Sequence, residues 1–160
     1  MFDFHADPGR PKPDLYRELA EAARALTAGE ADTIANMANL SALIWQFLPQ
    51  LNWAGFYRMA DGELVLGPFI GKPACIRIPL GKGVCGSAAA SATTQLVPDV
   101  HAFPGHIACD AASRSELVVP VIRDGRVIAV IDLDSPQPAR FDSADAAGIE
   151  ALAAVIAAVI

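Results

Sequence analysis

The run Trp53-Ala-Gly-Phe-Tyr-Arg-Met-Ala-Asp-Gly-Glu-Leu-Val-Leu-Gly-Pro-Phe-Ile70 decides the fold class. Two β-rich segments, Trp53 to Met59 and Glu63 to Ile70, flank Ala-Asp-Gly, which is a strong signal for a hairpin turn. Because so short a turn joins neighbouring strands that run in opposite directions, we expect these two to be antiparallel partners.

Further short strands are predicted on both sides of a long central loop. Residues Pro98 to Ser113 show neither helical nor strand periodicity, and a loop of this length inside a compact domain is usually functional or disordered. Before the loop, the predicted elements are a strand from Ala74 to Pro79, a small helix from the Gly81-Lys-Gly-Val-Cys-Gly-Ser run to about Ser91, and an edge strand from Gln95 to Val97. After the loop, a second hairpin is predicted, with strands Glu116 to Ile122 and Arg126 to Asp134 joined across Arg-Asp-Gly.

Helices are predicted at both ends of the chain. Residues 1–13 form a Pro-rich arm, and the predicted helices are Asp14, as N-cap, to Thr27, Gly29 to Leu48, and a helix capped by Asp142 or Ser143 that ends at Ile160. This order predicts a single α+β domain over residues 14–160, with a central antiparallel sheet of about five to six strands. The N- and C-terminal helices should pack on one face of the sheet, leaving the other for loops and a ligand pocket.

Composition excludes several classes of partner. The 160 residues are 53% apolar and carry 12 basic and 18 acidic residues, a net charge of −6. Without a basic cluster, nucleic acid and anionic membranes are not expected as partners. The start of the chain does not read as a secretory signal, and its most apolar segment, Ala144 to Ile160, is too short to cross a bilayer, so we expect a cytoplasmic protein.

Three cysteines stand in the sequence, at positions 75, 85 and 109. An odd number without an export signal argues against a permanent disulfide framework, and their spacing does not suit a structural zinc site, so we expect no bound metal. Cys109 lies in the long loop among polar neighbours, which favours a reactive thiol, although taken alone it reads more readily as a small buried hydrophobe. Cys75 and Cys85 are compatible with inert packing, but Cys85 is predicted at a helix N-terminus, where a thiol pKa is lowered.

Acidic and aromatic residues on the predicted strands point to a pocket. Asp132 and Asp134 share one strand face, and Glu116 opens the neighbouring strand, so the three predict an acidic pocket unless they simply face water at strand ends. Trp53 and Tyr57, four residues apart, also share a face and offer an apolar wall, although core packing explains them equally well.

One motif is given little weight. The string Gly81-x-Gly83-x-x-Gly86 matches a dinucleotide-binding fingerprint, but it lacks the surrounding βαβ unit and an acidic partner about 20 residues further on.

Taken together, the motifs resemble the free methionine-(R)-sulfoxide reductase family, whose fold is a GAF domain. The matching strings are Trp53-Ala-Gly-Phe-Tyr, Gly71-Lys-Pro-Ala-Cys-Ile-Arg-Ile, Gly81-Lys-Gly-Val-Cys-Gly, Asp99-Val-His-Ala-Phe-Pro-Gly-His-Ile-Ala-Cys-Asp and Ser115-Glu-Leu-Val-Val-Pro. The resemblance implies reduction of free L-methionine (R)-sulfoxide to L-methionine, with no bound cofactor. It also implies thioredoxin, itself reduced by NADPH and thioredoxin reductase, as the external reductant.

The resemblance also implies roles for single residues. Cys109 matches the nucleophile, Cys75 the usual resolving thiol, and Cys85 a third cysteine of variable role. Substrate binding falls to Trp53, Tyr57, Glu116, Asp132 and Asp134, and backbone amides of the loop, Ile107 and Ala108 among them, are expected to hold the substrate carboxylate.

Two rival interpretations remain at this level. A GAF domain can serve as a non-catalytic sensor of a small ligand or of redox state, although three cysteines and an acidic pocket suit a zwitterion better than a phosphate. Alternatively, the last helix could bind a partner through Ile149, Leu152, Val155, Ile156 and Val159, which present apolar surface on more than one side and are compatible with a homodimer.

Overall fold

The computed structural model describes residues 9–107 and 110–160. Its centre is one six-stranded sheet with strand order β3-β2-β1-β6-β5-β4, in which every neighbouring pair is antiparallel. The strands are β1 (Trp53–Ala60), β2 (Glu63–Gly71), β3 (Arg77–Pro79), β4 (Gln95–Val97), β5 (Ser115–Arg123) and β6 (Arg126–Ser135). The predicted antiparallel sheet and both predicted hairpins are confirmed.

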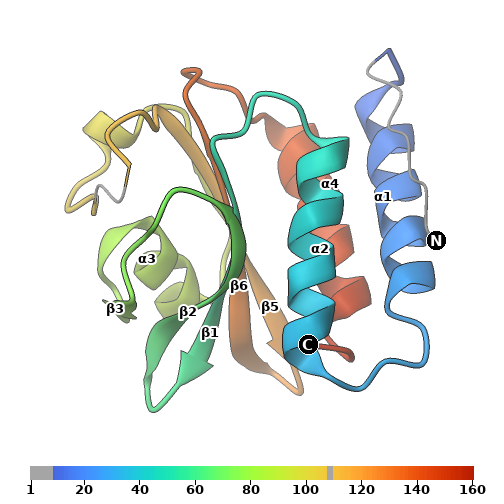
Figure 1. Ribbon diagram of the computed structural model, residues 1–160. Coiled ribbons are helices and arrows are strands. Elements are labelled where there is room, and N and C mark those ends of the chain that lie inside the picture. The colour runs from blue at the N-terminus through green and yellow to red at the C-terminus, as the bar shows by residue number, and fades with distance from the viewer. Residues whose placement is uncertain (1–8, 108–109) are drawn as a thin grey trace.

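Helices cover the two faces of the sheet unequally. Figure 1 shows the N- and C-terminal helices together on one side of β1, β5 and β6, and the short helix that begins at Gly83 on the other. The helices are α1 (Lys12–Leu26), α2 (Thr33–Phe47), α3 (Gly83–Ser91) and α4 (Ser143–Ile156), with a 3-10 turn η1 (Val100–Ala102) in the central loop. The predicted α+β arrangement, with terminal helices on one face and loops on the other, is confirmed.

Several element boundaries differ from the prediction, among them the end of α4, which lies at Ile156 rather than Ile160. α1 begins at Lys12 rather than after Asp14, because a proline in the first helical turn removes only an N–H that has no helical partner there. α2 begins at Thr33, where the Asp32 side chain accepts a hydrogen bond from Ala35 N at 2.9 Å. β3 covers only Arg77–Pro79, so Cys75 lies in the loop between β2 and β3.

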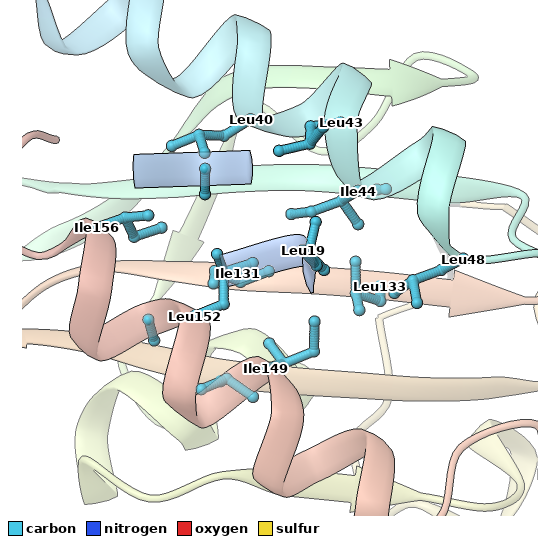
Figure 2. Close-up of a cluster of buried hydrophobic side chains, with 14 of the residues drawn as sticks. Leu19, Leu40, Leu43, Ile44, Leu48, Ile131, Leu133, Ile149, Leu152 and Ile156 are labelled. Carbon is cyan, nitrogen blue, oxygen red and sulfur yellow. The ribbon is translucent and has the colours of Figure 1, made fainter. Parts of the chain in front are cut away.

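The main hydrophobic core lies between the three-helix layer and the sheet. Strand alternation sends Ile131 and Leu133 of β6 toward the helices, while the residues between them face the opposite side. Figure 2 shows these two side chains between α2 and α4, which contribute Leu40, Leu43, Ile44, Ile149, Leu152 and Ile156. Truncating one such side chain to alanine typically costs about 2–5 kcal/mol.

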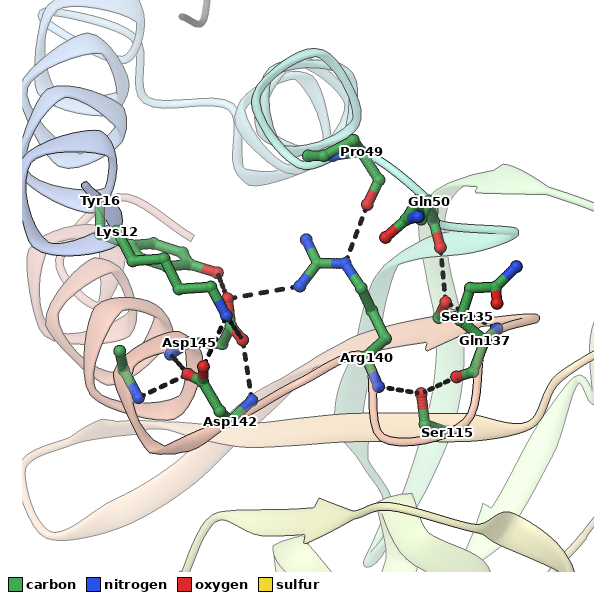
Figure 3. A network of polar contacts seen from close by, with 11 residues as sticks. Lys12, Tyr16, Pro49, Gln50, Ser115, Ser135, Gln137, Arg140, Asp142 and Asp145 are labelled. Atoms are coloured by element: carbon green, nitrogen blue, oxygen red, sulfur yellow. Dashed lines mark hydrogen bonds and ion pairs between the residues drawn. The ribbon is translucent and has the colours of Figure 1, made fainter. Parts of the chain in front are cut away.

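A buried polar network fastens α1 to the start of α4 (Figure 3). Asp145 accepts hydrogen bonds from Lys12 Nζ at 2.6 Å and from Tyr16 Oη at 2.7 Å. Gly148 lets the helices approach closely, because a Cβ there would collide with the Tyr16 ring. The second apolar side of α4 thus packs against α1 within one chain, and a homodimer through α4 stays a prediction.

In the part of the chain that the structure describes, no helix is both long and apolar enough to cross a membrane.

Candidate functional site

The strand register gathers the three predicted acids on the face opposite the main core. Asp134 pairs with Trp53 of β1 on one side and with Glu116 of β5 on the other, so these three residues form a row across the sheet. Asp132, two residues before Asp134 on β6, points to the same face. Glu116 and Asp132 are each 6% exposed and Asp134 is partly exposed, so the alternative that they merely face water is wrong.

These carboxyl groups belong to one pocket together with the predicted aromatic wall. Trp53 stacks on Tyr57 with ring centroids 5.8 Å apart, and on Phe69 from β2 at 5.1 Å. The indole N–H of Trp53 donates to the Lys72 carbonyl oxygen at 3.2 Å. The pocket is completed by residues of the β2–β3 loop, of β3, of the N-terminus of α3 and of the central loop: Lys72, Pro73, Ala74, Ile78, Lys82, Gly83, Val84, Cys85, His106, Ile107, Asp110 and Ser113.

The acids are held in an unusual electrostatic state. Burial raises the pKa of the Glu116, Asp132 and Asp134 carboxyls well above their usual range, and the charge of a neighbouring acid raises each further. Asp132 Oδ1 is buried and receives no hydrogen bond from the described residues. The pocket therefore holds carboxyl groups that retain protons at a pH where exposed acids are ionised, and it has an acceptor atom free for a ligand.

Cys85 faces this acidic cluster from α3. Its thiol is 4% exposed, and its sulfur lies within 4.8 Å of carboxylate oxygens of Glu116 and Asp132. Burial, followed by the charge of Asp132, raises its pKa well above the usual range. The expectation that the helix N-terminus would lower the pKa of Cys85 is thus wrong, because desolvation and negative neighbours outweigh the helix dipole.

The Gly81-x-Gly-x-x-Gly string has a local structural purpose. Gly83 adopts φ of +61° where α3 begins, and the Ile107 side chain packs where its Cβ would point. A Cβ on Gly86 would collide with the Pro79 carbonyl oxygen, so the third glycine permits close contact between α3 and the end of β3. These local roles of the glycines agree with the expectation that the string is not a dinucleotide-binding fingerprint.

His106 approaches the acids from the central loop. Its Nε2 lies 3.6 Å from Glu116 Oε2, but burial lowers the pKa of His106, which favours the neutral imidazole. The contact is therefore between two groups that both tend to be uncharged.

Asp110 organises the described part of the central loop, through more than a local cap. It does accept the capping hydrogen bond from Ala112 N at 2.9 Å. It also accepts from Asn52 Nδ2 at 3.2 Å and pairs with Lys72 Nζ at 3.2 Å. These donors, led by Ala112 N–H, lower the pKa of Asp110. An ionised acid thus stands at the pocket beside three acids that resist ionisation.

The predicted cysteines are placed unequally. Cys109 and Ala108 lie outside the described residues. Cys75 is partly buried against the apolar side chains under α3, and Ile107 lies over the α3 N-terminus with 36% of its surface exposed. The structure brings together the five predicted pocket residues on strands, along with Cys85 and Ile107.

Sequence reasoning did not identify Lys72, Asn52 or Ser113 as part of the site. Ser113 Oγ accepts from Asn52 Nδ2 at 3.0 Å, which links β1 to the end of the central loop. Lys72 lies three residues before Cys75 in the sequence, and this proximity to a cysteine was the signal that could have placed it in the site.

A metal ion has one set of potential ligands among the described residues: Cys85, Glu116 and Asp132, whose ligand atoms lie within 4.8 Å of one another. Their raised pKa values favour the protonated forms, which do not ligate metals well. The same groups are better suited to donating hydrogen bonds.

Comparison with known proteins agrees with this geometry. The GAF domain family model matches residues 35–160. The free methionine-R-sulfoxide reductase of Escherichia coli is 50% identical over 143 residues, which cover 89% of this chain and 87% of that protein. The structure of free methionine-R-sulfoxide reductase from Neisseria meningitidis in complex with its substrate has a TM-score of 0.93 at 44% identity and covers 99% of this chain and 95% of its own.

A structure from Burkholderia vietnamiensis, described as that of a GAF sensor protein, is 60% identical with a TM-score of 0.90 and covers 94% of this chain and 96% of its own. The sheet order, the acids on β5 and β6 and the aromatic wall of β1 thus occur in a chain that matches reductases over nearly its whole length. This chain belongs to the free methionine-R-sulfoxide reductase family of GAF domain proteins.

Proposed function

We propose that this protein reduces free L-methionine (R)-sulfoxide to L-methionine, with the Cys109 thiol as nucleophile. The observation that carries the proposal is the set of buried carboxyl groups with raised pKa beside the Trp53–Tyr57 wall, in a chain half identical to a reductase of this substrate. Reduction of a sulfoxide requires a proton on the departing oxygen, and a carboxyl group that keeps its proton near neutral pH supplies one.

The first step transfers oxygen between two sulfur atoms. The Cys109 sulfur attacks the sulfoxide sulfur while a carboxyl of the Glu116, Asp132 and Asp134 cluster protonates the sulfoxide oxygen. The oxygen moves to Cys109, so that the substrate sulfur gains two electrons, the Cys109 sulfur loses two, and methionine leaves. Cys109 becomes a sulfenic acid.

The second step regenerates the enzyme. The Cys75 thiol condenses with the Cys109 sulfenic acid, forms a disulfide and releases water, and a dithiol such as thioredoxin then reduces the disulfide. Cys85 suits the resolving role less well, because its buried thiol has a raised pKa. The cycle depends on reduced thiols, so we expect it to operate in the cytoplasm.

Specificity for the free amino acid follows from charge. The acids of the pocket that do ionise receive the substrate ammonium group. Backbone amides near Ile107 and Ala108 receive the carboxylate. A methionine sulfoxide within a peptide lacks both charged groups, and these buried partners would then be left without hydrogen bonds.

The decisive assay follows NADPH consumption with thioredoxin and thioredoxin reductase. We expect turnover of free methionine (R)-sulfoxide and none of the S epimer or of a peptide-bound sulfoxide. Absence of turnover with the free R form would exclude the reductase and favour a non-catalytic sensor, the role given to the Burkholderia vietnamiensis relative.

Single-turnover experiments separate the cysteines. Cys109→Ser should produce no methionine, whereas Cys75→Ser should produce one equivalent without forming a disulfide. A disulfide formed at the wild-type rate in Cys75→Ser would assign the resolving role to Cys85.

A further inference from the structure

The two described cysteines differ in how a protein partner can reach them. Cys85 is 4% exposed beneath α3, whereas Cys75 is partly exposed in the loop between β2 and β3. This loop lies on the α3 side of the sheet, at the pocket (Figure 1). A bulky reductant must bring its own sulfur into line with the sulfur it attacks, and of the two described cysteines Cys75 is the more accessible for this approach.

Ile76, the residue after Cys75, exposes a large apolar side chain to solvent. The Ile76 side chain is 71% exposed, the highest value among the large apolar side chains that the structure describes as exposed. Its backbone is nevertheless fixed, because the Ile76 carbonyl oxygen accepts from Leu66 N at 2.9 Å. An exposed apolar side chain on a hydrogen-bonded backbone, beside the thiol that the proposed function makes redox-active, is suited to anchor a protein interface.

Charge distinguishes this surface from the rest of the molecule. The chain has a net charge of −6, yet from Leu64 to Pro98 it contains no Asp or Glu. Within that stretch Lys72, Arg77 and Lys82 are exposed, the Lys72 side chain by 70%. Lys72 pairs with Asp110, and Arg77 pairs with Glu63, the residue directly before this stretch, whereas Lys82 has no ion pair among the described residues. An acidic partner therefore meets less repulsion at this stretch than over the rest of a chain with a net charge of −6, which favours its approach beside Cys75.

We propose that a thioredoxin-type reductant docks on the surface around Cys75. This surface, here called the Cys75 patch, consists of Lys72, Cys75, Ile76, Arg77 and Lys82. The partner is a protein dithiol whose reactive cysteine is surrounded by apolar and acidic residues. The inference rests on the proposed function, since it needs a disulfide between Cys75 and Cys109. A thiolate of the partner attacks the Cys75 sulfur and releases the Cys109 thiolate. The second thiol of the partner then attacks its own mixed disulfide and releases Cys75, so that the partner supplies both electrons.

The test compares a protein reductant with a small one. Ile76→Ser should raise the KM for thioredoxin about fivefold to tenfold, as expected when an interface anchor is truncated, and should leave turnover supported by dithiothreitol unchanged. The matched control is Ile34→Ser, since Ile34 is 45% exposed on α2, on the opposite side of the sheet. It should change neither value.

Ile76→Asp should raise the KM for thioredoxin further, because it adds a negative charge to the patch, and added salt should lower kcat/KM for thioredoxin but not for dithiothreitol. An unchanged thioredoxin KM in both Ile76 variants, or an equal change in Ile34→Ser, would overturn the docking surface while leaving the reductase intact. If the wild type fails to turn over with dithiothreitol as well, the proposed function fails instead.

Discussion

Asp145 at the start of α4 and Asp132 on the pocket face of β6 are both almost completely buried, 1% and 6% exposed, but they differ in their surroundings. Asp145 receives hydrogen bonds from Lys12 Nζ, Tyr16 Oη and Asp142 N at 2.6 to 2.8 Å, and Arg140 Nη1 lies 3.5 Å away. These donors are visible around Asp145 in Figure 3. Asp132 instead faces Glu116 and Cys85, and its Oδ1 has no donor among the described residues.

The difference separates a structural acid from a functional one. The donors around Asp145 compensate for its desolvation, so the group can hold two helices together. No comparable compensation surrounds Asp132, and the folded state stabilises its protonated form. A buried acid with one oxygen left without a donor is costly for folding, and such a cost is typical of groups kept for binding or catalysis.

The largest expected effect comes from making Asp132 neutral. Asp132→Asn should lower kcat for free methionine (R)-sulfoxide by about 10²- to 10⁴-fold, the range of general acid–base contributions. The same substitution should raise Tm at pH 8 by about 2 to 4 °C, equivalent to about 1 kcal/mol in a domain of this size. Steady-state kinetics and calorimetry measure both.

A matched substitution at an exposed acid tests whether the gain is specific. Asp124→Asn changes the turn between β5 and β6 and should alter neither kcat nor Tm. If Asp132→Asn kept kcat within tenfold of the wild type, Asp132 would not take part in the reaction.

Removing the compensated acid should have the opposite consequence. Asp145→Ala leaves Lys12 and Arg140 without their buried partner, and should lower the free energy of unfolding by about 3 kcal/mol while kcat per folded molecule stays the same. Urea unfolding measures the change. Asp14→Ala is the control, because its exposed pair with Arg17 contributes no more than about 1 kcal/mol. Equal losses in the two variants would contradict the structural role of Asp145.

The pH dependence of stability should distinguish the two kinds of acid by sign. Asp132 has a folded pKa above its unfolded value, so its contribution is fully present below the unfolded pKa and is lost as pH rises toward the folded pKa. The Tm advantage of Asp132→Asn should therefore shrink between pH 8 and pH 4 and vanish at the acid end. A constant advantage would show that the gain is unrelated to ionisation.

Asp142 provides the opposite case. Its hydrogen bond from Lys12 lowers its pKa to about 2, so its contribution is present above the unfolded pKa and lost as pH falls toward 2. Asp142→Asn should therefore lower Tm at pH 7 and cease to do so near pH 2. Thermal unfolding of both variants across one pH series gives the comparison directly.

Sequence patterns predicted the strands better than the helix ends. β4 lies at Gln95–Val97 as expected, and strand alternation placed Trp53, Tyr57, Glu116, Asp132 and Asp134 on one face. The start of α1 was missed because proline restricts a helix only beyond its first turn. Ile34 follows the helical period of α2 yet is 45% exposed, since one turn of periodicity at a helix start does not determine what packs against it.

The electrostatics of the site could not be predicted from local sequence. The pKa of Cys85 is set by acids on β5 and β6, far along the chain, and not by the helix that carries it. The contact of Lys72 with Asp110 joins two loops, where no periodicity indicates which side chains meet. Such contacts depend on loop paths that only the folded chain determines.

Asp110 combines features of the two kinds of acid: it lies at the pocket, as Asp132 does, but it has hydrogen-bond donors, as Asp145 does. Removing one of its partners gives the smallest of the predicted effects. Its ion pair with Lys72 connects the loop that carries Cys75 to the residue after Cys109. Lys72→Gln removes a pair in which the lysine is 70% exposed, worth about 0.5 kcal/mol, and should slow disulfide formation about twofold without changing the single-turnover yield of methionine. Rapid-quench thiol counting measures the rate. High salt should slow the wild type toward the variant, because salt screens an exposed pair. A slower rate that salt does not affect would mean that the pair holds the loops by its packing rather than by its charge.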